Sequence, residues 1–355
     1  MYKSFKIKWF RGFKEIEVEN IQQVNLIAGL NNVGKTALLE AIFLHCGASN
    51  PDMANQLNAI RGIKVAGIKL RQVADVFWTQ LFFNLDPFSQ VEIEGTDDKE
   101  QKRWLRLKIV PQGSRLIKIG PEAQDTEERS DSSVHEALEL EYQDKERTQR
   151  YQLIFDSLQR VARIEPIPPP PPFPACFLTT RKSTLSEDAE QYGNLEVEGQ
   201  QDILLEILKI IEPRLKRLAV ITRAGIPMIH GDIGIGRLLP LPLMGEGMVR
   251  ICSLVLTIAN IPNGVVLIDE IENGLHHSVM GKLWKAVGDI ARRFNAQIFA
   301  TTHSYECLVA AHRAFSESTY DFCLHRLENI KGKIKVIAYD QERLESTIEN
   351  GWEIR

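Results

Sequence analysis

A glycine-rich segment between two apolar stretches restricts the possible folds most strongly. Residues 29–36 read Gly-Leu-Asn-Asn-Val-Gly-Lys-Thr, which is a glycine, four residues and then Gly-Lys-Thr. Residues 24–28 before it predict a buried strand, and the apolar spacing from residue 35 onward predicts a helix. Glycines let the backbone turn so that its N–H groups face an anion, and the start of a helix adds a positive dipole end. We therefore expect this segment to bind the phosphates of a nucleotide.

The side chains of this segment have separate expected roles. Lys35 is expected to reach the β- and γ-phosphates, and the hydroxyl of Thr36 is expected to bind Mg²⁺. The other expected nucleotide-binding residues are Asn31, Asn32, Val33, Gly34 and Ala37. The pattern indicates ATP as the substrate and Mg²⁺ as the cofactor.

A second apolar strand ends in two acidic residues. Residues 265–268 are Val-Val-Leu-Ile, and Asp269 and Glu270 follow them. The carboxyl ends of strands are the places where α/β sheets bind ligands. Asp269 is expected to hold Mg²⁺, directly or through water, and Glu270 to orient and deprotonate the attacking water. Alone this could be an ordinary strand end, but after the glycine-rich segment it indicates ATP hydrolysis.

A third strand is predicted at residues 297–301 and is followed by Thr302, His303 and Ser304. His303 comes 34 residues after Asp269 (303 − 269). By itself it could be a surface or core histidine.

These three blocks, in this order, resemble the ABC-type heads of RecF, SMC and OLD proteins. More narrowly they resemble bacterial AAA-family ATPases close to OLD nucleases, many of which are linked to phage defence. The specific match covers about residues 1–46 and 236–310. It implies an α/β P-loop NTPase fold, an ABC-type head with an antiparallel β-subdomain and an inserted helical arm. It also implies that His303 contacts the γ-phosphate and that ATP is held between two heads of a homodimer.

The resemblance implies a signature segment that caps the ATP of the opposite subunit. The candidate is residues 243–248, in which Gly245 and Gly247 could bind phosphate through their N–H groups. The usual serine is missing and Glu246 is an awkward neighbour for a phosphate, although Arg250 could compensate. The alternative is a glycine turn before a core helix.

Other parts of the family pattern are less specific. Residues 272–275 match the segment after the acidic pair and are expected at the dimer seam. Gln80 is one candidate for the family's glutamine, and Arg181 is either a basic residue near nucleotide or DNA or a surface charge. The adjacent His276 and His277 are not read as metal ligands, because neighbours do not share a helix face.

The expected organisation has three parts. Residues 1–46 and 236–355 form the head, and residues 47–235 form the β-subdomain and the arm. The proline-rich residues 165–174 predict a stiff spacer, with a docking site for a proline-binding partner as the alternative. Residues 121–150 are charge-rich and predict an exposed helix or mobile loop. Residues 202–218 predict an amphipathic helix that is closed near Pro213.

Composition restricts location and partners. The net charge of −4 shows no overall bias toward DNA, which stays possible only through a local patch. The five cysteines have neither metal-ligand spacing nor an even count, and no apolar run is long enough to span a bilayer, so a cytoplasmic protein is expected. Full OLD nucleases carry a C-terminal Toprim domain, whose acidic residues serve metal-dependent DNA cleavage. The pattern of these acidic residues is not found after His303, so a nuclease or other effector is expected in trans. The alternative function is a nucleotide-gated scaffold with negligible turnover that regulates a partner.

Overall fold

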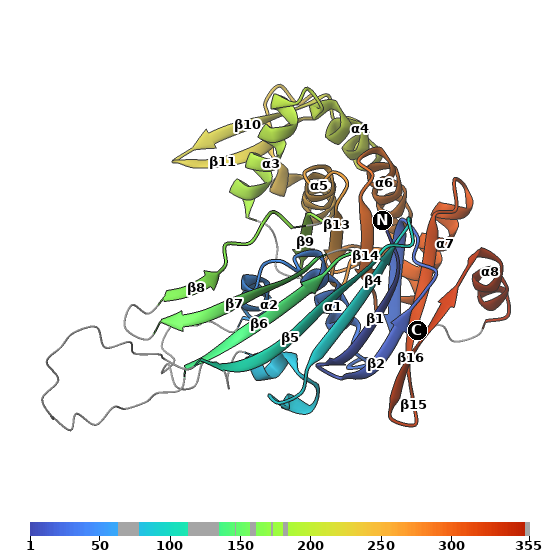
Figure 1. Ribbon diagram of the computed structural model, residues 1–355. Coiled ribbons are helices and arrows are strands. Elements are labelled where there is room, and N and C mark those ends of the chain that lie inside the picture. Colours follow the sequence, from blue (N-terminus) through green and yellow to red (C-terminus); the bar gives the residue numbers. More distant parts are fainter. Residues whose placement is uncertain are drawn as a thin grey trace, which may run out of the picture.

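Two large sheets enclose one helix, and further helices cover the far side of the second sheet (Figure 1). The computed structural model describes residues 1–62, 78–112, 135–145, 147–156, 161–171, 173–179 and 184–351. This arrangement is the α/β P-loop fold with an antiparallel subdomain that the sequence predicts.

The first sheet, called sheet A, is antiparallel and has seven strands. In spatial order they are β2 (Phe13–Val18), β1 (Tyr2–Phe10), β4 (Val91–Asp97), β5 (Lys102–Gln112), β6 (His135–Gln143), β7 (Thr148–Asp156) and β8 (Val161–Glu165). Alternate residues of β4 are buried, as expected for a sheet with one face on the core and one face in solvent.

The second sheet, called the core sheet, has six strands, of which all except β16 run parallel. In spatial order they are β16 (Lys333–Tyr339), β15 (Phe322–Ile330), β3 (Val24–Gly29), β14 (Gln297–Thr301), β13 (Val265–Ile268) and β9 (Ala175–Leu178). Every residue of β3, β13 and β14 is buried, because both faces of these strands are covered.

Helices cover the two faces of the core sheet differently. The helices are α1 (Lys35–Cys46), α2 (Asp52–Ile60), α3 (Leu185–Val197), α4 (Gln201–Ile211), α5 (Glu246–Ala259), α6 (Met280–Arg293), α7 (Tyr305–Ser316) and α8 (Gln341–Glu349), with 3₁₀ turns η3 (Thr79–Leu81), η4 (Phe83–Leu85), η5 (Leu241–Met244) and η6 (His277–Val279). Helix α1 packs between the core sheet and sheet A, and every residue of it except Thr36 is buried. Helices α5, α6 and α7 pack on the opposite face of the core sheet (Figure 1).

The prediction for residues 121–150 is wrong over most of the part that the structure describes. Residues 135–143 and 148–156 are the strands β6 and β7, and residues 113–134 lie outside the described residues. Charged side chains alternate with buried ones here and pair across strands, which a simple charge count does not detect. One row across six strands reads Glu15, Lys8, Glu92, Arg106, Glu141 and Arg150.

The amphipathic helix predicted within residues 202–218, with its end near Pro213, is confirmed as helix α4. Helix α4 ends at Ile211, and from Arg217 the chain forms a small antiparallel sheet of β10 (Arg217–Arg223), β11 (Ile226–Asp232) and β12 (Leu239–Pro240). Pro213 cannot continue the helix, because it has no N–H to donate. Together with α3 and α4 this sheet forms the arm, seen at the top of Figure 1.

The proline-rich segment links the edges of the two large sheets. Residues 165–174 connect the edge strands β8 and β9 of the two sheets, and most of their described residues are exposed. Among the described residues, no helix is long and apolar enough to cross a bilayer.

Candidate functional site

The glycine-rich segment forms a loop between β3 and α1 whose shape requires glycine at two positions. Gly34 has a φ of 103°, and a Cβ there would lie 2.8 Å from the ring of Phe13. Gly29 has a φ of 143°, and a Cβ there would lie 2.5 Å from the carbonyl oxygen of Leu327. The loop is therefore shaped by sheet A on one side and by β15 on the other.

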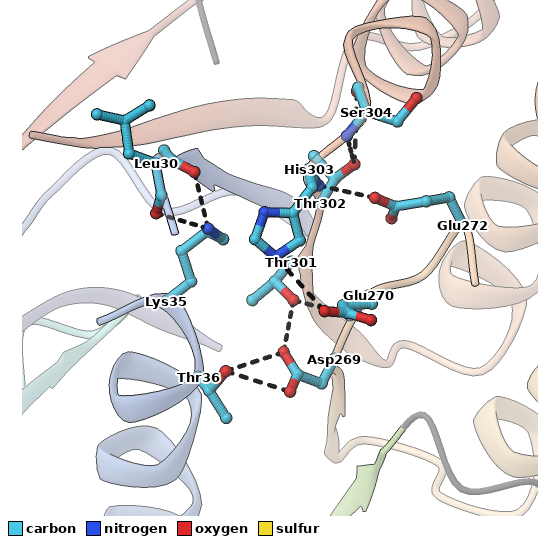
Figure 2. Close-up of polar contacts among 11 residues, drawn as sticks. Leu30, Lys35, Thr36, Asp269, Glu270, Glu272, Thr301, Thr302, His303 and Ser304 are labelled. Carbon is cyan, nitrogen blue, oxygen red and sulfur yellow. Dashed lines mark hydrogen bonds and ion pairs between the residues drawn. The ribbon is translucent and has the colours of Figure 1, made fainter. Parts of the chain in front are cut away.

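Lys35 lies along this loop. Its Nζ donates hydrogen bonds to the carbonyl oxygens of Gly29 (2.7 Å) and Leu30 (3.0 Å), as Figure 2 shows for Leu30. Burial lowers the pKa of Lys35, and the carboxylates of Asp269, Glu270 and Glu272 partly offset this shift. A cation held beside the loop N–H groups is suited to bind a polyphosphate.

The hydroxyl of Thr36 and the carboxylate of Asp269 face each other (Figure 2). The Thr36 Oγ1 is 3.2 Å from both carboxylate oxygens, and the Thr301 hydroxyl donates to Asp269 Oδ1 at 2.7 Å. Hydroxyl and carboxylate oxygens are hard ligands of the kind that Mg²⁺ prefers, and Mg²⁺ usually takes only one or two protein carboxylates. The residues present therefore fit the predicted Mg²⁺ site.

Glu270 and His303 meet above this pair. His303 Nε2 lies 3.5 Å from Glu270 Oε1, and both side chains are about two-fifths exposed, at 39% and 40%. The backbone of Glu270 has a φ of 50°, which is uncommon for a residue with a side chain. The Thr301 hydroxyl accepts the Glu270 N–H at 2.8 Å and so stabilises this conformation. Strained backbone of this kind is concentrated at functional sites.

The signature segment has different surroundings. Gly245 precedes α5, has a φ of 111°, and a Cβ there would have no heavy atom within 4 Å. Leu243 is 72% exposed, and Glu246 and Gly247 form the first turn of α5. Because α5 and α1 pack on opposite faces of the core sheet, Gly245 and Gly247 are not part of the cluster around Lys35. The Nε and Nη2 atoms of Arg250 are buried and have no hydrogen-bond partner among the described residues.

The structure thus brings together Lys35, Thr36, Asp269, Glu270 and His303. In the glycine-rich loop, Asn31 and Asn32 are exposed, whereas Val33 and Ala37 are buried. Gln80 lies on η3, where its carbonyl oxygen accepts a hydrogen bond from Arg11 at 3.3 Å. Arg181 lies outside the described residues.

Two buried polar residues were not predicted, one in the site and one on helix α1. Thr301 ends the predicted strand at residues 297–301, and the sequence pattern predicts no role for it, although it contacts both Asp269 and Glu270. Glu40 is fully buried on α1 and pairs with Arg11 and Arg61, each through a 2.6 Å contact. An acidic residue one turn after Thr36 in an otherwise apolar helix is the signal that could have identified it.

Comparison with known proteins agrees with this geometry. Residues 24–308 match the family described as "AAA domain, putative AbiEii toxin, Type IV TA system". The chain is 24% identical over 359 residues to an ATP/GTP phosphatase of Helicobacter pylori, covering 91% of this chain and 92% of that protein.

Among solved structures, the fold is similar to an SMC head bound to the C-terminal winged-helix domain of ScpA, with a TM-score of 0.51 and 11% identity over 97% of this chain and 99% of that one. The SMC head domain of Thermotoga maritima matches with a TM-score of 0.47 and 11% identity over 96% and 99% of the two chains. The family match covers well over half of the chain, so the chain belongs to this AAA-domain family and is an ATPase whose fold is similar to that of an SMC head.

Proposed function

We propose that the protein hydrolyses ATP in composite sites between the two heads of a homodimer. The observation that carries the proposal is the separation of the two glycine segments. The catalytic cluster gathers around Lys35, whereas Gly245 lies exposed before a helix on the opposite face of the core sheet. A second chain is the simplest source of a signature segment for each P-loop.

Exposed apolar side chains support the same interface. Leu30 in the P-loop is 71% exposed, and Leu243 before the signature glycines is 72% exposed. Both side chains would be buried if the P-loop of one head faced the signature segment of the other, and burial of apolar surface favours association. Two such loops on one chain fit a head-to-head arrangement.

In the proposed reaction, the oxygen of a water molecule bonds to the γ-phosphorus while the bond to the bridging oxygen of ADP breaks. Glu270 orients this water and accepts its proton. Lys35, the loop N–H groups and His303 stabilise the charge on the phosphate oxygens. Thr36 and Asp269 would hold Mg²⁺, which neutralises phosphate charge when it is bound.

The proposal requires that His303 release Glu270. In the structure the imidazole lies 3.5 Å from the carboxylate that the water needs. A γ-phosphate would offer His303 a competing acceptor. The contact seen here is therefore assigned to the resting enzyme.

The Glu270→Gln variant tests the proposal, because it keeps the size of the side chain and removes the base. Turnover should fall roughly 10²- to 10⁴-fold, the usual contribution of a positioned general base. ATP binding should persist, and light scattering with ATP and Mg²⁺ should show a doubled mass. Glu15→Gln on the outer face of sheet A is the matched control. A mass that does not respond to ATP would count against the composite site.

A nucleotide-gated scaffold with negligible turnover is the second candidate. The observation in its favour is Glu246, an exposed acid in the first turn of α5, where it would face a partner's phosphate. Turnover of the wild-type chain separates the two, because a scaffold should hold the ATP-bound dimer through many minutes without releasing phosphate.

The further roles in DNA-related or phage-defence processes, with an effector in trans, stay a prediction. One surface is a poor candidate for DNA, because the row of charges across sheet A alternates in sign. Arg106 pairs with Glu141 at 2.9 Å, and Arg150 pairs with the same carboxylate at 2.8 Å. A DNA-binding surface needs an excess of positive charge. Stimulation of turnover by DNA, compared at low and high salt, tests this role.

A further inference from the structure

Glu272 follows the acidic pair and is partly buried. Its Oε1 accepts a hydrogen bond of 2.7 Å from the backbone N–H of His303 (Figure 2). Its Oε2 is buried and has no hydrogen-bond partner among the described residues. Glu272 is only partly buried as a residue, but a single buried carboxylate oxygen without a partner still costs stability, so its presence calls for a function.

His303 lies on a short connection whose two neighbours are fixed. The N–H of Thr302 donates to the carbonyl oxygen of Ile27 at 3.1 Å. The hydroxyl of Ser304 accepts the N–H of Cys307 at 3.1 Å and caps α7. Between them, the Glu272 carboxylate holds the main chain of His303, and the His303 ring reaches Glu270.

The main chain of Glu272 leads to the signature segment. The N–H of Leu275 donates to the carbonyl oxygen of Glu272 at 3.0 Å. The side chain of Leu275 reaches α5, because its Cδ2 would lie 3.6 Å from a Cβ at Gly247. Glu272 therefore contacts His303 in the site of its own chain. Through Leu275 it is also connected to the signature segment, which would complete the site of the other chain.

We infer that Glu272 is a positioning residue that sets where His303 stands and links it to the signature segment of the same chain. This inference rests on the proposed function, in which His303 contacts the γ-phosphate. A shift of α5 on closure of the dimer would move Leu275 and then Glu272. His303 would follow, so each site would respond to occupation of the other.

Two substitutions separate the hydrogen bond from the charge. Glu272→Ala removes the acceptor, whereas Glu272→Gln keeps an acceptor oxygen and removes the charge. We expect Glu272→Ala to lower kcat about tenfold with little change in KM, as for the loss of one hydrogen bond to a charged group. Glu272→Gln should stay within about threefold of wild type.

Hydrogen exchange gives a readout that does not depend on catalysis. The peptide covering residues 302–308 should exchange faster in Glu272→Ala than in wild type or Glu272→Gln, without a matching change in Tm. Unchanged exchange in Glu272→Ala would overturn the inference. Equal losses of kcat in the Ala and Gln variants would also overturn it, because charge rather than hydrogen bonding would then be responsible.

A double-mutant cycle with His303→Ala tests whether Glu272 acts through the histidine. The double variant should be no slower than His303→Ala alone, since the group that Glu272 positions is already absent. Multiplicative losses would overturn the inference. If His303→Ala leaves kcat unchanged, the proposed function is wrong about His303, while faster exchange in Glu272→Ala would still report the hydrogen bond.

Discussion

The two glycine segments of this chain differ in how much their own chain supports them. The P-loop is enclosed, because Gly34 packs on Phe13, Gly29 packs on Leu327, and Lys35 bonds to loop carbonyl oxygens. The signature segment is open, because nothing lies within 4 Å of a Cβ at Gly245. A loop that is complete in one chain can bind nucleotide alone, whereas an open loop forms a binding site only when another surface packs against it. Changes in the P-loop should therefore affect binding, and changes in the signature segment should affect hydrolysis and assembly.

The largest effect is expected from Lys35→Ala. It removes the cation beside the phosphate-binding N–H groups, so ATP affinity should fall roughly 100-fold or more. Isothermal titration calorimetry measures this, with the exposed Lys333→Ala as the control. An unchanged affinity would show that the enclosed loop is not the nucleotide site.

The next largest effects are expected from a matched pair of glycine substitutions, one in each segment. Gly34→Ala places a Cβ 2.8 Å from Phe13 and should lower the free energy of unfolding by roughly 1–3 kcal/mol, with loss of ATP binding. Gly245→Ala meets no neighbour, but the φ of 111° strains an alanine and so alters the backbone of the signature segment. ATP binding should therefore persist while turnover falls about tenfold. Chemical denaturation and calorimetry give stability and affinity for both variants. Equal losses of affinity in the two variants would remove the distinction between the segments.

A smaller effect is expected from a charge at the open segment. Leu243→Asp puts a carboxylate on an exposed apolar position and should weaken ATP-dependent dimerisation about tenfold, leaving Tm nearly unchanged. Leu85→Asp is the control, since Leu85 is also exposed but lies on η4 and belongs to neither segment. Analytical ultracentrifugation of both variants in the Glu270→Gln background measures the effect. Equal weakening by both would point to a general effect of charge.

The P-loop side should also differ in its stability in acid. Burial lowers the pKa of His45, at the end of the P-loop helix, to about 4 from an ordinary value of 6.5. Between pH 6.5 and 4, His45 is therefore largely protonated in the unfolded chain and largely neutral in the folded chain. The stabilisation is complete above pH 6.5 and is lost as the pH falls toward 4, by about 1.4 kcal/mol per pH unit for one group.

Urea unfolding between pH 7 and 5 measures this slope. His45→Gln should make the free energy of unfolding less dependent on pH than it is in the wild type. A slope that His45→Gln does not alter would exclude this histidine as the source.

Local patterns predicted the elements that carry the ATP site. Residues 24–28, 265–268 and 297–301 are strands as expected, and the helix after the P-loop begins at Lys35. These elements were predictable because their glycines, apolar runs and terminal acids act within a few residues of sequence. The strands β6 and β7 were missed because their charges are balanced by partners on neighbouring strands.

The sequence by itself determined a P-loop ATPase, because the phosphate-binding turn and the acidic strand end are local requirements of backbone geometry and charge. Only the tertiary structure decided which polar groups share one site. Thr301 joins Asp269 to Glu270, Glu272 holds the main chain of His303, and Glu40 lies between two arginines that come from separate segments. Such contacts depend on how strands and helices from distant parts of the chain pack together. They have no fixed spacing in the sequence, so a sequence pattern does not predict them.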